Sequence, residues 1–253
     1  MLSAISSAMA RVRPRVAALK DKATMLDSWA GALKVASTAA IPDVSQTLSD
    51  VERDPMGSTI DMGRLEDTIA RRRGELQAID AEQKEVLAEL ARGKTTLAEL
   101  QDAIARSTTT FAEASQTITP PEELAQPVGA ADTASLAEWL RTLGQNTADG
   151  RFAAVKVGMV KWERECSDKL NAARAGNDHN CGLLDERVEL QGRFKAVSAK
   201  AATLRKRGIV FGEAAEAASR QASGVLDAVP FDIRTGRRLV EAFEAAVAAA
   251  SRP

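Results

Sequence analysis

Residues 65–118 read LEDTIARRRGELQAIDAEQKEVLAELARGKTTLAELQDAIARSTTTFAEASQTI, and this stretch decides the fold. Apolar residues recur along it in alternating strides of four and three, which is the spacing of a coiled-coil seam. One heptad register is apolar at all but one position: Ile69, Leu76, Gln83, Leu90, Leu97, Ile104, Phe111 and Ile118. The second register is interrupted by Arg72, Gly93 and Ser107. The pattern predicts one long helix that turns a continuous face toward a partner helix.

The N-terminal segment carries a second apolar stripe with the same spacing. Its members are Leu2, Ile5, Met9, Val12, Val16, Leu19, Ala23, Leu26, Ala30 and Leu33. Pro14 lacks a backbone donor, so it predicts either a kink or a helix that begins near Arg13. Pro42, Pro55 and Gly57 predict a loop over residues 41–62. We therefore expect residues 1–118 to form an elongated antiparallel coiled-coil hairpin.

Residues 119–134, TPPEELAQPVGAADTA, are rich in proline and should be a linker between two domains. Ser135 and Glu138 have the spacing of a capping box that opens a new helix. The polar segment 176–182, GNDHNCG, predicts a turn between two further helices.

The apolar stripes beyond the linker predict a helical bundle over residues 135–253. Trp162 should lie in its core, because Val155, Met159 and Cys166 share its helical face.

Composition favours helices throughout the chain. The 253 residues are 45% hydrophobic but only 4% aromatic, with no Tyr. Alanine supplies much of the apolar content, and small side chains favour close packing of helices over a thick β-sheet core. The apolar run at 209–211 is too isolated to build a sheet. The predicted fold class is all-α.

The charge balance narrows the classes of partner. Lys and Arg number 34 against 35 Asp and Glu, which gives a net charge of −1. A generic nucleic-acid binder usually has a large positive excess, so we expect no nucleic-acid partner. No apolar run approaches the length of a membrane span, which is about 18 residues. Ser3, Ser6, Ser7 and Arg11 interrupt any secretory signal, so we expect a cytoplasmic protein.

Gly93-Lys94-Thr95 resembles the end of a phosphate-binding loop. That motif also needs a glycine five positions earlier, where this chain has Ala88. It further needs a strand before the loop, whereas the triplet lies inside the heptad pattern. We predict no nucleotide site here.

Asp178, His179 and Cys181 form the other cluster whose side chains could bind a metal or act as a nucleophile. Zinc needs four ligands, and this is the chain's only histidine. Cys166 and Cys181 form no paired metal motif, and reduced thiols are expected. A polar turn explains these residues better than a metal site or a nucleophile. We predict no catalytic residue, cofactor or metal, and therefore no enzyme.

Four segments beyond the linker resemble a helical region of bacterial, especially actinobacterial, signalling or stress-response cassettes. Those cassettes combine kinases, phosphatases, von Willebrand domains and forkhead-associated domains. The segments are LAEWL (136–140), GRFAAVKVGMVKWERE (150–165), LLDERVELQGRFKAVSAKA (183–201) and LVEAFEAAVA (239–248). The resemblance implies an accessory component of a larger assembly, and it carries over no catalytic residue.

Two functional hypotheses follow. The first is a non-enzymatic scaffold or adaptor that binds a protein partner, or a second copy of itself, through its coiled-coil seams. The second is a peripheral membrane protein that uses residues 1–22, where basic residues flank the apolar stripe. A basic amphipathic N-terminus before a helical hairpin is similar to the architecture of phage-shock and ESCRT-III-type membrane-remodelling proteins. Pro14 and the tryptophan-containing C-terminal half depart from that architecture.

Overall fold

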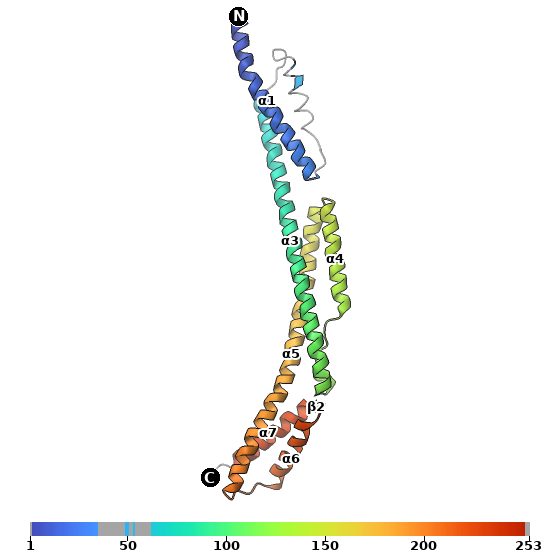
Figure 1. Ribbon diagram of the computed structural model, residues 1–253, viewed down its shortest axis with the longest axis vertical. Helices are drawn as coiled ribbons and strands as arrows, with labels where there is room; N and C mark the ends of the chain where they lie inside the picture. Colours follow the sequence, from blue (N-terminus) through green and yellow to red (C-terminus); the bar gives the residue numbers. More distant parts are fainter. Residues whose placement is uncertain (1, 35–48, 51–52, 54–61, 251–253) are drawn as a thin grey trace. The chain divides into compact units, whose positions relative to one another are not determined.

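The computed structural model describes residues 2–34, 49–50, 53 and 62–250, with side chains from Ala10 onward. Within these residues the fold is all-α, as predicted (Figure 1). The helices are α1 (Leu2–Ala32), α3 (Met62–Thr117), α4 (Ala130–Ala148), α5 (Phe152–Lys206), α6 (Glu213–Asp227) and α7 (Ile233–Ala250). Two-residue strands β1 (Ile118–Thr119) and β2 (Phe231–Asp232) and the 3₁₀ turn η1 (Pro121–Glu123) complete the described elements.

The predicted long helix is α3, which has 56 residues. Its seam is buried at most positions of both heptad registers. The interruptions Gly93 and Ser107 are buried as well, and Val86, Leu100 and Ala114 are fully covered. Small residues on the seam therefore mark close helix contacts rather than the end of the helix.

The chain forms two compact units. Unit 1 contains residues 1–92 and 140–160, and unit 2 contains residues 93–139 and 161–253. These units do not follow the predicted boundaries at 118 and 135, because α3 and α5 each contribute residues to both of them.

Unit 1 is built on α1 and the first part of α3. Its core joins the N-terminal stripe to α3 through Val16, Leu19, Ala23, Leu26, Ala30, Leu33, Ile69 and Leu76. The two helices run in the same direction (Figure 1), so the predicted antiparallel arrangement is wrong for this pair. A heptad stripe is equally apolar in either direction, and so it does not encode the orientation. Pro14 lies inside α1, and almost all of the predicted 41–62 loop lies outside the described residues.

Unit 2 contains the part of α5 that includes residues 176–182, where a turn was predicted. That prediction is wrong, since α5 continues through the segment without a break. Ala173, Gly176, Asn180 and Leu183 keep the spacing of three and four, and all of them are buried. The same stripe holds Trp162 in the core, as predicted, and its Nε1 donates a hydrogen bond to the Leu136 carbonyl at 2.8 Å.

In unit 2, α3 and α5 also run in the same direction (Figure 1). Thr110 Oγ1 donates to Asn177 Oδ1 at 2.9 Å, and Cys181 Sγ lies 4.0 Å from Thr110 Oγ1. One turn earlier on α3, Ser107 faces Gly176. The residue numbers of the contacting residues thus rise together along the two helices, as a parallel pair requires.

The predicted linker is part of the core of unit 2. Strand β1 pairs with β2 in parallel, with Ile118 opposite Phe231, and Leu124 after η1 is buried. Helix α4 begins at Ala130, so Ser135 lies inside the helix rather than at its cap. A proline-rich composition predicted a linker here, but Leu124 packs in the core and Asn180 binds the backbone of Ala125.

Helices α6 and α7 close unit 2 against the second half of α5 (Figure 1). The rings of Phe194 and Phe243 lie with their centroids 5.7 Å apart. Gly236 on α7 lies directly against the Phe231 ring, where an added Cβ would overlap the ring carbons. At Gly176 an added Cβ would be 3.7 Å from both Ala125 Cβ and Ser107 Oγ, which is ordinary contact.

These two glycines predict opposite effects of the same substitution. Gly236→Ala should lower the free energy of unfolding, because overpacking costs about 1–3 kcal/mol. Gly176→Ala should raise it by up to about 1 kcal/mol, because alanine is the better helix former and the space exists. Urea unfolding followed by circular dichroism measures both changes. Equal shifts of the two variants would contradict this packing.

Candidate interaction groove

The two sequence segments that were considered as possible binding or reactive sites both lie inside helices. Gly93-Lys94-Thr95 is part of α3, with Gly93 buried on the seam. Asp178, His179 and Cys181 lie on α5, where His179 Nε2 donates to the Glu123 carbonyl at 2.6 Å. Among the described residues, no group of three His, Cys, Asp or Glu could hold a metal ion.

Cys166 is buried on the α5 stripe. Burial, together with the negative charge of Glu99, raises the pKa of its thiol, so the thiolate is disfavoured.

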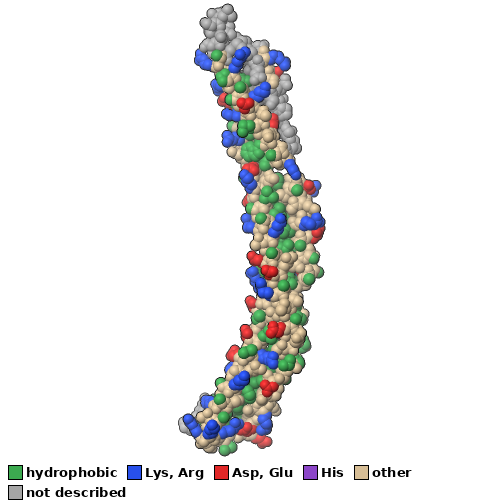
Figure 2. Space-filling view, viewed as in Figure 1, with side chains coloured by type: hydrophobic (Ala, Val, Ile, Leu, Met, Phe, Trp, Pro, Cys, Tyr) green, Lys and Arg blue, Asp and Glu red, His purple; other side chains and the backbone are tan. Residues whose placement is uncertain are grey.

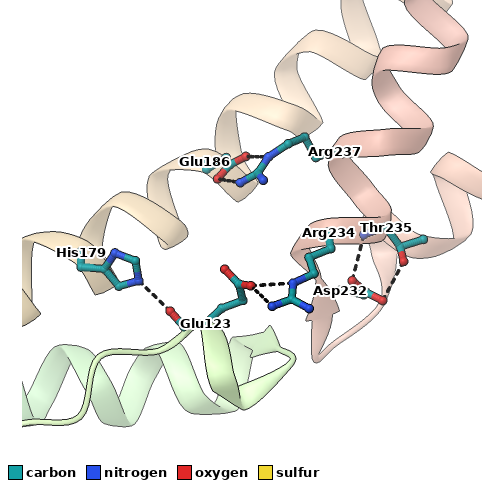
Figure 3. Close-up of polar contacts among 7 residues, drawn as sticks. All are labelled: Glu123, His179, Glu186, Asp232, Arg234, Thr235 and Arg237. Carbon is teal, nitrogen blue, oxygen red and sulfur yellow. Dashed lines mark hydrogen bonds and ion pairs between the residues drawn. The ribbon is translucent and has the colours of Figure 1, made fainter.

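A polar cluster fastens η1, α5 and α7 in unit 2 (Figure 3). Arg237 binds Glu186 through two nitrogens and both carboxylate oxygens, at 2.7 and 2.8 Å, whereas two nitrogens of Arg234 contact a single carboxylate oxygen of Glu123. The hydrogen bond from Arg237 lowers the pKa of Glu186 below its ordinary value. All of these charged groups are paired with one another, as in ion pairs that hold secondary-structure elements together rather than in a reactive centre.

Two further carboxylates make hydrogen bonds at α7. Asp232 accepts hydrogen bonds from the Thr235 backbone N–H at 2.9 Å and from its hydroxyl at 2.8 Å, which lowers the pKa of Asp232 (Figure 3). This is the geometry of a helix N-cap. Glu244 is held by Arg193 at 2.9 and 2.6 Å, and that hydrogen-bonded pairing lowers the pKa of Glu244.

Asn180 provides the buried polar contact of this region. Its amide accepts from the Ala125 N–H and donates to the Ala125 carbonyl, both at 2.9 Å. The side chain thereby satisfies a backbone donor and acceptor that would otherwise be unpaired.

Among the described residues, a groove lies in unit 1 along one side of the α1–α3 pair. It encloses about 580 Å³ and is lined by Leu19, Lys22, Met25, Leu26, Trp29, Glu66, Ile69, Ala70, Arg73, Gly74 and Gln77. The floor consists of Leu19, Leu26 and Ile69, all buried in the core of unit 1. Met25 stands on the rim with 72% of its surface exposed. Figure 2 shows apolar side chains among charged ones on this part of the surface.

Small residues on α3 create the groove. Ala70 and Gly74 are four residues apart and therefore share one face of the helix. An added Cβ at Gly74 would meet nothing within 4 Å, so the space beside it is open. On the other wall, Trp29 of α1 packs partly against the core. Sequence analysis missed this site, although the Ala70–Gly74 pair beside a long seam was a usable signal.

The charged groups at the groove are mainly basic. Glu66 is already paired with Arg15, at 2.9 Å. Lys22 and Arg73 have no ion pair within the part of the chain that the structure describes. The groove is therefore apolar along its floor, with two cations available at its edges.

No family model, curated protein or solved structure matches this chain. The groove and its chemistry are thus the basis for assigning a function. Across the described helices, none combines the length and apolarity needed to span a bilayer.

The paired carboxylates predict a pH dependence of stability. The pKa values of Glu186 and Glu244 are lowered from 4.5 in the folded chain. Their contribution is present above the unfolded pKa and is lost as the pH falls through the lowered folded pKa. The free energy of unfolding should therefore drop between about pH 5 and about pH 3. Denaturant titrations at the two pH values measure this loss.

Replacing the arginines gives the matched test. Arg237→Met with Arg193→Met should make this acid-side loss smaller, because the two carboxylates then titrate near their ordinary value. Arg220→Met, an exposed arginine on α6, should leave the loss as in the parent chain. An unchanged loss in the double variant would show that these pairs do not govern acid stability.

Proposed function

We propose that this chain is a non-enzymatic helical adaptor that receives an amphipathic helix of a protein partner in the α1–α3 groove. The groove is the observation that carries the proposal. A helix that lays an apolar face into a hydrophobic groove is a common mode of protein recognition.

The dimensions of the groove suit a helix. The α1 wall runs from Leu19 to Trp29, and the α3 wall runs from Glu66 to Gln77. At 1.5 Å per residue each wall is about 16 Å long, which matches roughly three turns of a docked helix. The shallow face at Ala70 and Gly74 would allow its backbone to come close to α3, while Met25 adapts to its side chains.

Charge specifies the chemistry of the partner helix. Lys22 and Arg73 lie at the groove and are available for ion pairs, so the complementary helix carries Glu or Asp beside its apolar stripe. Such charges contribute more to specificity and to the association rate than to affinity. The apolar anchors over Leu26 and Trp29 would supply most of the binding energy.

The remaining contacts also favour an adaptor. The residues with reactive potential, Asp178, His179 and Cys181, lie on α5 in unit 2, remote in sequence from the groove residues of unit 1. The apolar stripe from Val16 to Leu33 is buried against α3, so most of its side chains already have a protein partner. We accordingly propose an accessory role in a multiprotein assembly ahead of membrane binding by residues 1–22.

The test uses the full chain and a designed acidic peptide with leucines at helical spacing. Incorporated 5-fluorotryptophan reports on Trp29, whose ¹⁹F signal is assigned with Trp29→Phe. We expect the peptide to shift the Trp29 signal and not the signal of buried Trp162. A peptide of the same composition in scrambled order should shift neither.

Gly74→Leu places a side chain in the groove, and the Cβ of that side chain has open space around it. It should weaken peptide binding by about tenfold or more, equal to about 1.4 kcal/mol. The control is Gly192→Leu, at an exposed glycine of α5 that also has nothing within 4 Å. It gains the same helix propensity and should leave binding unchanged. Equal affinity of the parent chain and Gly74→Leu would contradict the proposal.

A further inference from the structure

The end of α5 and its connection to α6 form the most basic segment of unit 2. Residues 195–212 contain no Asp or Glu, and their cations are Lys195, Lys200, Arg205, Lys206 and Arg207. The chain as a whole has a net charge of −1, so this concentration of cations is local. Figure 2 shows blue side chains gathered where α5 ends in Figure 1.

The connection holds its apex away from the core. Gly208 has a φ of +86°, which turns the chain out of α5. Leu204 and Phe211, on either side of the apex, are buried in one cluster with Phe243 of α7. Between these anchors Val210 is 90% exposed. The two anchors fix the loop, so the exposed valine is held at its tip.

The three consecutive cations have different surroundings. Arg205 is paired with Glu216 at 2.6 Å and lies over the Phe211 ring, 5.2 Å from its centroid. It therefore helps to fix the loop. Lys206 and Arg207 are exposed, and neither side chain forms an ion pair within the described residues.

We propose that this tip, Lys206 to Val210, is a contact site for an anionic phospholipid surface. Lys206 and Arg207 would pair with lipid phosphates and carboxylates, while Val210 enters the interface. An exposed aliphatic residue three positions after these cations favours lipid over nucleic acid, which is contacted by polar and aromatic side chains. The site is separate from the groove of unit 1, and it would let the adaptor engage its partner at a membrane surface.

The test is co-sedimentation of the full chain with vesicles. Phosphatidylcholine vesicles should bind little, and vesicles that also contain phosphatidylserine should bind at low salt and release the chain at high salt. Lys206→Glu with Arg207→Glu should reduce binding by at least about thirtyfold, because each cation near an anionic leaflet contributes about fivefold. The matched control reverses Lys161 and Arg164, two exposed cations elsewhere on α5 in unit 2. It should bind like the parent chain.

The apolar contact is tested separately. Val210→Ser should weaken binding and make it more sensitive to salt, whereas Val188→Ser, at an exposed valine in the middle of α5, should have no effect. Circular dichroism of each variant establishes that the helices remain intact.

Several outcomes would overturn the proposal. One is no binding of the parent chain to anionic vesicles, and another is equal loss in the Lys161 and Arg164 control. Binding of duplex DNA but not of vesicles would assign the tip to nucleic acid instead. Loss of vesicle binding in a chain that begins at Ala10 would assign the lipid contact to the N-terminal segment.

Discussion

The parallel packing of α3 on α5 is the constraint on which unit 2 depends. Ser107 and Gly176 let the two helices approach closely, and Asn180 one turn later binds both backbone groups of Ala125. That contact holds the chain after α3 against α5, so β1 can pair with β2 and α7 can dock. The ion pairs of Arg234 and Arg237 lie outside this packed core and add polar contacts between elements that already pack together (Figure 3). Exposed pairs of this kind contribute about 0–1 kcal/mol each, much less than a buried seam.

The heptad pattern predicted the helices but not their directions. Apolar residues at spacings of three and four establish which face of α3 is buried, and that face was identified correctly. The burial of Trp162 on α5 was predicted from the same spacing. Orientation depends on where the connections run, and periodicity holds no information about it. The segment 176–182 shows a different failure. Its glycines, asparagines and Asp178 have the composition of a turn. Asn180 nevertheless occupies a seam position, because the Ala125 backbone satisfies the hydrogen bonds of its side-chain amide. A buried polar residue with a backbone partner cannot be recognised from composition alone.

The groove was missed in the sequence for a related reason. Gly74 is only an unfavourable helix residue until the neighbouring α1 is placed, after which it and Ala70 form an open wall opposite Trp29. The basic end of α5 was visible as a run of cations, but the exposure of Val210 depends on the two anchors that bury Leu204 and Phe211. In both places small or charged residues acquire a role from the elements packed around them. The proposed adaptor role uses such surfaces, and each of them lies on a long helix with a buried seam.

The most direct measurement of the packing of α3 on α5 is an engineered disulfide. Thr110→Cys places a thiol next to native Cys181, whose Sγ lies 4.0 Å from the Thr110 hydroxyl. Cys166 is buried on the seam and does not compete. Mild oxidation should join the new thiol to Cys181 nearly completely, with unchanged helicity and a raised melting temperature, as peptide mass mapping and circular dichroism would record. A chain in which Cys181 stays fully reactive after oxidation would contradict the packing of α5 on α3 at Thr110.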